Sequence, residues 1–140
     1  MLHNRETTIR NHERFVTRVA ESETVWGINI GTGFASADSH DGSGTPVIMF
    51  WSDRAYALRA QKPSFPDATV DSIPLLDRLF RWLPGMDQDC VLAGTNWTAD
   101  LAGLETKPDD LQSQLIDAMS EQLIVQYREM ANEIRNNRTE

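Results

Sequence analysis

Two acidic residues that follow predicted strands are the side chains best suited to acid–base chemistry. Asp53 comes shortly after the apolar run 47–51, and Asp100 lies in a polar turn after Trp97. Carboxylates in such places can exchange protons with a bound substrate. Each also suits a structural role, because Asp53 opens a predicted helix at the positive end of its dipole and Asp100 fits a turn. Both interpretations stay open.

The four tryptophans lie at the ends of predicted elements or in turns beside them: Trp26, Trp51, Trp82 and Trp97. Such placement suits a ligand pocket or a protein-binding patch. Large aromatic side chains also fill compact cores, where each indole N–H needs an acceptor. Core packing is the favoured interpretation for the first three, whereas the two interpretations balance for Trp97, which follows Asn96 in a polar turn.

These side chains define one candidate small-molecule site, between segment 26–34 and the turns at 52–53 and 96–100. Its candidate binding residues are Trp26, Trp51, Asp53, Asn96, Trp97 and Asp100. No residue is assigned a catalytic role, because no serine or cysteine nucleophile falls into a familiar pattern with a base. Whether the protein is an enzyme is left open.

Neither the loop 38–44 nor the single cysteine predicts a metal or cofactor. An EF-hand loop needs oxygen ligands at alternate positions and a glutamate at the twelfth, but His40 takes an alternate position and Met49 the twelfth. The histidines share no zinc-ligand spacing with Cys90. The glycines at 31 and 33 lack the third glycine of a dinucleotide fingerprint. We therefore expect no metal and no cofactor.

Three arginines recur every fourth residue in the first predicted helix: Arg10, Arg14 and Arg18. This stripe could receive an anion. A solvated helix face is the favoured interpretation, because residues 1–20 hold four arginines against two glutamates, a net charge of only +2.

Composition excludes several classes of function. The 140 residues carry 13 Lys and Arg against 21 Asp and Glu, a net charge of −8, which argues against nucleic acid as a partner. No stretch approaches the roughly 18 apolar residues that span a bilayer, and the N-terminus lacks a signal-peptide core. One cysteine permits no internal disulfide and fits a reducing compartment. We therefore expect a cytoplasmic protein that binds no membrane.

Apolar residues recur at helical spacing in four segments: 7–20, 53–61, 74–82 and a long stretch from Pro108 to about 135. Pro74 suits the first residue of the third helix, and Pro84 with Gly85 should stop it. A hydroxyl followed three residues later by an acid, over 106–109, is typical of the start of the last helix.

Strands are predicted for four further segments: 24–30, 47–51, 91–93 and 101–104. Segment 34–37 should return beside the first of them as a hairpin. The sequence thus predicts one α+β domain over 1–135 and a frayed tail over 136–140. We expect a single small, mainly antiparallel sheet of four or five strands, covered by three or four helices that include the long C-terminal helix.

Five groups of residues, in this order, resemble a family of short bacterial proteins catalogued as domain of unknown function 2750. They are Val25-Trp26-Gly27; Phe50-Trp51-Ser52-Asp53 with Ala55-Tyr56-Ala57; Ile73-Pro74-Leu75; Trp82-Leu83-Pro84-Gly85-Met86; and Gly94-Thr95-Asn96-Trp97 with Pro108 and Leu111. The resemblance covers roughly 15–115. It implies a single-domain architecture, and it brings no activity, cofactor or catalytic residue with it.

Two functions follow as hypotheses. The preferred one is a non-catalytic module, immunity-like or regulatory, whose acidic surface steers a partner with a basic surface. The excess acid supports it, since segments 21–53 and 84–110 each carry −5. The alternative is a small-molecule-binding or hydrolytic domain that uses the acidic and aromatic turn residues. A homodimer through the C-terminal helix is also expected.

Overall fold

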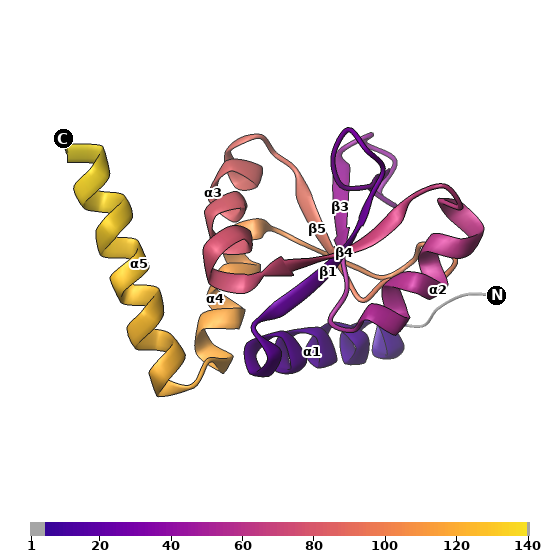
Figure 1. Ribbon diagram of the computed structural model, residues 1–140. Helices are drawn as coiled ribbons and strands as arrows, with labels where there is room; N and C mark the ends of the chain where they lie inside the picture. The colour runs from indigo at the N-terminus through magenta and orange to yellow at the C-terminus, as the bar shows by residue number, and fades with distance from the viewer. Residues whose placement is uncertain (1–4, 140) are drawn as a thin grey trace.

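The computed structural model describes the backbone of residues 5–139 and the side chains of residues 5–136. Its helical elements are α1 (Arg5–Ser22), α2 (Arg54–Ser64), the π-helical turn η1 (Leu75–Leu79), α3 (Phe80–Gln88), α4 (Pro108–Ala118) and α5 (Glu121–Thr139) (Figure 1). Its strands are β1 (Thr24–Asn29), β2 (Ser36–Asp38), β3 (Pro46–Phe50), β4 (Thr69–Pro74), β5 (Leu92–Thr95) and β6 (Leu104–Thr106). The predicted α+β class is confirmed.

The strands form two ladders instead of the single expected sheet. One has the order β2-β3-β5-β6, with β3 and β5 parallel and the other neighbours antiparallel. The other is the antiparallel pair β1–β4. An isolated bridge joins the ladders, because the backbones of Trp26 and Trp51 exchange two N–H···O bonds of 2.8 Å. The strands therefore act as one continuous layer.

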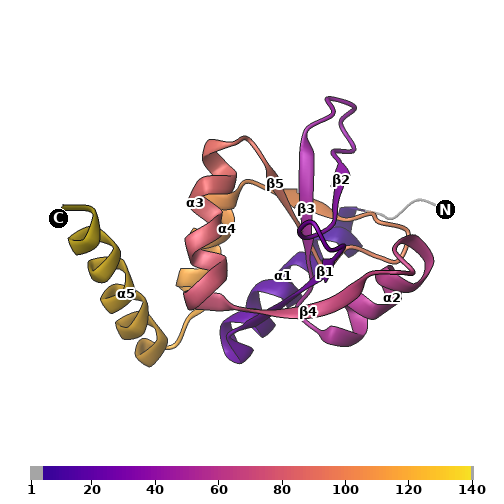
Figure 2. The ribbon, with the colours of Figure 1, turned by 45° about the horizontal axis from the view of Figure 1, so that its top comes forward.

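This layer separates two hydrophobic clusters. Side chains alternate across a strand, so Val25 and Phe50 join a cluster with α1, α3, α4 and α5. On the other face, Ile28, Met49 and Trp51 pack on α2. The two views of the ribbon agree, with α2 and α3 on opposite sides of the strands (Figures 1 and 2). In β3, which lies between the clusters, Val47, Met49 and Phe50 are buried, which explains the continuous apolar run of this strand.

The predicted hairpin between β1 and segment 34–37 is wrong about the main pairing partner of each strand. Segment 34–37 returns beside β1 at its start, where Phe34 bridges Asn29 and the Ala35 N–H donates to the Ile28 carbonyl at 2.7 Å, but the strand β2 pairs with β3. Along its whole length β1 pairs with β4, so that Pro74 ends a strand and does not begin a helix. This pairing buries Ile73 opposite Val25. A contact between residues so far apart in the chain leaves no local pattern.

The stop expected at Pro84 and Gly85 is also wrong, because both residues lie inside α3. Leu83 and Met86 flank them and are buried in the core. Burying such side chains contributes roughly 1.5–3 kcal/mol each, enough to offset the cost of about 3 kcal/mol for an interior proline.

The long C-terminal helix is broken in two. Met119 is extended (φ −71°, ψ 148°). Ser120 precedes α5 and caps it, accepting an N–H from Leu123 at its Oγ (3.2 Å) and one from Ile124 at its carbonyl (3.0 Å). Thr106 does not cap α4, whose N-cap residue is Lys107.

Helix α5 packs on its own chain. Leu123 and Met130 are buried, and the Tyr127 ring meets Phe80 edge-on at 5.5 Å. The homodimer expected through this helix stays a prediction, which light scattering tests. The expected tail 136–140 lies mostly beyond the side chains that the structure describes. No helix within residues 5–139 has the length and apolar character needed to cross a membrane.

Candidate functional site

The carboxyl ends of β3 and β5 lie side by side because these strands are parallel neighbours. The residues after β3 (51–53) and after β5 (96–98) therefore meet at one edge of the sheet, where α/β proteins commonly bind ligands. The amide N–H of Asn96 donates to the Phe50 carbonyl at 3.0 Å, which extends the contact one residue beyond the ladder.

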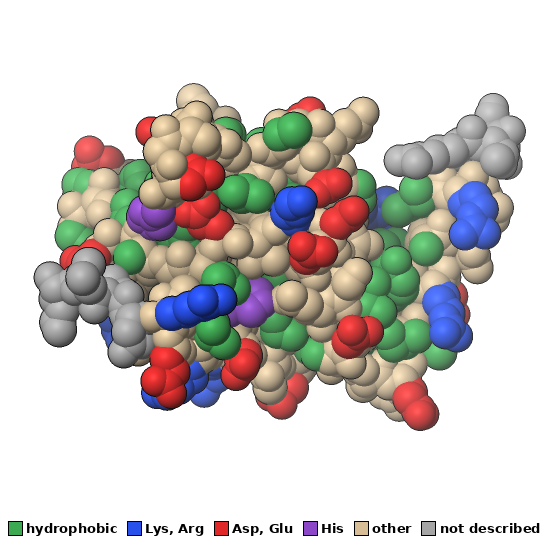
Figure 3. All heavy atoms as spheres, turned by 180° about the vertical axis from the view of Figure 1, so that it is seen from behind, with side chains coloured by type: hydrophobic (Ala, Val, Ile, Leu, Met, Phe, Trp, Pro, Cys, Tyr) green, Lys and Arg blue, Asp and Glu red, His purple; other side chains and the backbone are tan. Residues whose placement is uncertain are grey.

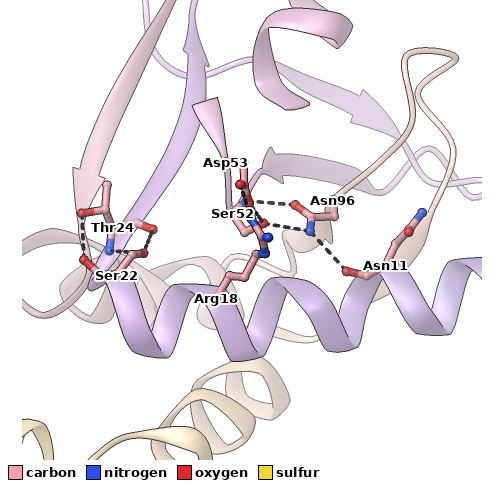
Figure 4. Close-up of polar contacts among 7 residues, drawn as sticks. All are labelled: Asn11, Arg18, Ser22, Thr24, Ser52, Asp53 and Asn96. Carbon is pink, nitrogen blue, oxygen red and sulfur yellow. Dashed lines mark hydrogen bonds and ion pairs between the residues drawn. The ribbon is translucent and has the colours of Figure 1, made fainter. Parts of the chain in front are cut away.

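The Asn96 side chain connects the segments at this edge by hydrogen bonds (Figure 4). Its Oδ1 accepts the backbone N–H of Ser52 at 2.9 Å, and its Nδ2 donates to Ser52 Oγ at 3.0 Å and to the Asn11 carbonyl of α1 at 3.3 Å. Asn96 is buried and adopts a left-handed backbone (φ 49°), which asparagine tolerates better than most residues. It is thus a positioning residue that ties α1, β3 and β5 together.

Asp53 is held by two neighbours. Its Oδ2 forms an ion pair with Arg18 of α1, and its Oδ1 accepts a hydrogen bond from Ser52 Oγ at 2.7 Å (Figure 4). Asp53 is the N-cap residue of α2 but makes no capping hydrogen bond through its side chain. The pair therefore fastens the start of α2 to α1.

Trp97 is part of the hydrophobic core. Its indole N–H donates to the Leu104 carbonyl at 2.8 Å, its side chain is 2% exposed, and its ring fills space where Gly94 and Gly103 have no side chain. The indole N–H of Trp51, fully buried, donates to the Trp97 carbonyl at 2.8 Å.

The structure gathers most of the sequence-predicted binding residues at this edge. Trp26 is half-buried, and its backbone forms a β-bridge with that of Trp51. This bridge places Trp26 at the same edge as Asp53, Asn96 and Trp97. Asp100 is exposed in the turn beyond them. The polar side-chain groups of Trp51, Asp53, Asn96 and Trp97 bond to other parts of the chain, so the role of these four residues is chiefly structural.

A cavity of about 200 Å³ opens beside Asn96. Its walls come from α1, α2 and the turn after β5: Asn11, Arg14, Tyr56, Arg59, Asn96, Trp97, Thr98 and Ala99. Of the described residues that line it, none is a carboxylate, a histidine or a cysteine. The charged groups at this cavity are two guanidinium groups.

Neither of those guanidinium groups forms an ion pair with a carboxylate that the structure describes. In the arginine stripe of α1, Arg10 pairs with Glu6 at 3.5 Å and Arg18 pairs with Asp53, whereas Arg14 between them has no ion pair among the described side chains. Arg59 of α2 likewise has none, and its guanidinium lies 5.4 Å from the centre of the Tyr56 ring.

Sequence reasoning found only part of this cavity. The arginine stripe was visible as a spacing of four, but the spacing could not show which arginine lacks a partner. Tyr56 and Arg59 were missed because they share a cavity with Arg14 only where the start of α2 meets α1, at the Arg18–Asp53 ion pair. Their spacing of three, which places two side chains on one helix face, was the available signal.

Two further polar features lie outside the lining of this cavity. His12 is buried behind it, with Nδ1 2.7 Å from Thr95 Oγ1 and Nε2 2.5 Å from Gln114 Oε1. In the loop before β3, hydrogen bonds from the Ser43 hydroxyl and backbone, and then from Ser39, hold the pKa of the Asp41 carboxyl below its ordinary value.

A larger groove, of about 520 Å³, lies between α3 and α5. Its walls are mostly apolar, including Phe80, Pro84, Tyr127, Met130 and Ile134, with Arg81 at the margin. It offers fewer groups that could orient a ligand than the cavity beside Asn96.

A family model matches residues 12–115, and its description is "Protein of unknown function (DUF2750)". The match includes α1 from His12 onward, every strand and most of α4, and it leaves out α5. No curated protein and no solved structure matches the chain.

Proposed function

The chain belongs to the DUF2750 family, proteins of unknown function, and from its geometry we propose that it is a non-catalytic binding module for a small anionic group. The binding site is the cavity beside Asn96. The observation that carries the proposal is the pair Arg14 and Arg59, two guanidinium groups that line one cavity and have no carboxylate partner within residues 5–136.

These two arginines are distinguished by the cavity that they share. Among the described arginines, Arg10 and Arg18 form ion pairs with carboxylates, whereas Arg14 and Arg59 form none and line one cavity together. A guanidinium presents five donors in a planar fork that matches carboxylate and phosphate oxygens. Two such forks beside neutral amide and hydroxyl groups favour an anion over any other small ligand.

The cavity's neutral and cationic lining supports binding rather than acid–base catalysis. The two carboxylates considered for proton transfer are elsewhere, since Asp53 is engaged by Arg18 and Ser52, and Asp100 is absent from the cavity's lining. The volume of about 200 Å³ is below the 300–1,000 Å³ typical of drug-sized ligands. The ligand is therefore a small anion or one anionic group of a larger molecule.

A thermal-shift panel of sulfate, phosphate, acetate and citrate tests this proposal. We expect at least one anion to raise the melting temperature of the natural protein, and Arg14→Ala and Arg59→Ala to abolish the rise. Arg10→Ala is the matched control, because Arg10 lies on the same helix but outside the cavity. If the anion shifts all three variants equally, its binding is unrelated to the cavity and the proposal fails.

A basic protein partner is the second candidate, favoured by the distribution of acid. Acidic side chains gather over the upper middle of the face seen from behind (Figure 3), and Asp109 and Asp110 form the first turn of α4. Such a field steers a basic protein, as an immunity-like or regulatory module requires. Co-purification from the native host at low and high salt tests it, and a chain that elutes alone at both contradicts it.

We also propose a cytoplasmic location. Cys90 is a free, exposed thiol, and such a group persists best in a reducing compartment. Fractionation of native cells with an antibody against the chain tests this location directly.

A further inference from the structure

The charge of the cavity beside Asn96 points to the class of anion that it takes. Two cations line it, one on α1 and one on α2, and its other lining residues are neutral. We infer that the ligand is a phosphate monoester in its dianionic form, an inference that rests on the proposed function. A monocarboxylate neutralises one guanidinium and leaves the other unpaired, whereas a phosphate dianion has charge and oxygens for both.

The two arginines are mounted on elements whose relative position is fixed. The Arg18–Asp53 ion pair fastens α1 to the start of α2, and the Asn96 amide donates to the Asn11 carbonyl of α1 at 3.3 Å. Arg14 lies one helical turn from Arg18 and Arg59 lies in the second turn of α2. The backbones that carry Arg14 and Arg59 are therefore held near one another before a ligand arrives, which lowers the ordering cost of binding.

Neutral groups and the helix end add to the preference for phosphate. Asn11 and Tyr56 line the same cavity and carry an amide and a hydroxyl that can donate to phosphate oxygens. Tyr56 lies in the first turn of α2, near the end where the helix dipole is positive. These groups suit a ligand with several acceptor oxygens at one centre.

The volume favours an ester over inorganic phosphate alone. The cavity of about 200 Å³ exceeds several times the roughly 30 Å³ that one water occupies in the liquid, so part of an organic group fits beside the phosphate. That organic group belongs either to a small phosphorylated metabolite or to a phosphorylated serine or threonine of a protein. Both sources present the same dianion.

Calorimetric titration at pH 7.5 and pH 5.0 tests the inference, with glycerol phosphate, sulfate and acetate as probes. The second pKa of a phosphate monoester is about 6, so the dianion fraction falls about tenfold between these pH values. We expect the affinity for glycerol phosphate to fall by about that factor. Sulfate stays doubly charged over this range, and its affinity should not change, so sulfate controls for any effect of pH on the protein itself.

Single substitutions test whether the preference for phosphate depends on the two arginines of the cavity. Arg14→Ala and Arg59→Ala should each remove the preference for glycerol phosphate over acetate, whereas Arg59→Lys keeps the charge and should retain part of it. Arg10→Ala should leave the preference intact. Circular dichroism checks that each variant is folded, and the exposure of Arg14 and Arg59 at the surface makes these substitutions compatible with folding.

The outcomes separate this inference from the proposed function. If acetate binds as tightly as glycerol phosphate and depends on both arginines, the anion site stands and the phosphate inference is overturned. If sulfate loses affinity with falling pH as strongly as glycerol phosphate, the protein titrates and the inference is again overturned. If no anion binds, both fail.

A phosphoserine peptide distinguishes the two sources of the phosphate group. If it binds at least tenfold tighter than glycerol phosphate, and its unphosphorylated form does not bind, the natural ligand is a phosphorylated protein. If it binds with equal affinity, the natural ligand is a free phosphate ester.

Discussion

Asn96 and Ser52 hold the ends of two parallel strands together through a reciprocal pair of hydrogen bonds. Ser52 N–H donates to Asn96 Oδ1 at 2.9 Å, and Asn96 Nδ2 donates to Ser52 Oγ at 3.0 Å. Both residues are buried, so each bond is made away from bulk water. The relationship sets the distance between the turn that precedes α2 and the turn that follows β5, and thereby the cavity that lies between α1 and α2.

Replacing Asn96 should therefore destabilise the protein in a graded way. Asn96→Gly keeps the left-handed backbone but leaves the buried Ser52 N–H without its acceptor, at a cost of about 1–3 kcal/mol. Asn96→Ala should cost about 1–2 kcal/mol more, because alanine is strained at φ 49°. Urea denaturation measures both free energies of unfolding. Equal stability of Asn96→Gly and the natural protein would show that the side-chain bonds contribute nothing.

Two glycines should resist substitution because of Trp97. A Cβ on Gly94 would lie 2.6 Å from Trp97 Cε2, and one on Gly103 would overlap Trp97 Cδ1. We expect Gly94→Ala and Gly103→Ala to destabilise by about 1–3 kcal/mol each, since the wedged ring must shift. The matched control is Gly85→Ala in α3, where a Cβ meets nothing within 4 Å and should stabilise by about 0.5–1 kcal/mol. Thermal denaturation compares the three, and a stabilising Gly103→Ala would contradict the packing described for Trp97.

The break before α5 should depend on Ser120. Ser120→Ala removes the acceptor for the Leu123 N–H and should cost about 1 kcal/mol, whereas Ser120→Asp, another good N-cap, should preserve stability. Ser113→Ala, at an exposed position within α4, is the control. Amide hydrogen exchange in the first turn of α5 reports the effect locally. Unchanged exchange in Ser120→Ala would mean that packing alone starts the helix.

The Asp41 carboxyl should titrate below its ordinary range. Hydrogen bonds from Ser43 and Ser39 favour its charged form and lower its pKa in the folded protein. Its contribution to stability is therefore present above the unfolded-state pKa and is lost as pH falls through the folded-state pKa. A carboxyl-detected NMR titration follows this group, and Ser43→Ala should raise its pKa. A midpoint that does not move in Ser43→Ala would contradict the assigned cause.

The parts of the fold that the sequence predicted are those with local causes. The spacing of Phe15 and Val19 marks α1, and the apolar run through Phe50 marks β3. The pairing of β1 with β4 and the persistence of α3 through Pro84 depend on contacts between distant segments, and these override local propensity.

The residues of the candidate site likewise divide into those placed by local sequence patterns and those placed by contacts between distant segments. Asp53, Asn96 and Trp97 were grouped because they follow predicted strands, and the parallel pairing of β3 and β5 brings them to one edge. Arg14 and Arg59 line one cavity because α1 and α2 meet at the edge of the sheet, and no spacing along the chain expresses that. The arginine stripe of α1 does not show by its spacing which member could bind an anion. The ion pairs of its two outer members, Arg10 and Arg18, leave Arg14 as the candidate.

The most direct test of the anion site is an NMR titration that observes the arginine side chains themselves. With glycerol phosphate as the probe, and with Nε–H resonances assigned through single Arg→Lys variants, we expect Arg14 and Arg59 to shift along one saturable curve. The backbone amides of 96–99 should follow the same curve, while Arg10 and Arg18 stay in place. Shifts that are linear in concentration, or that centre on Arg10 and Arg18, would contradict the site.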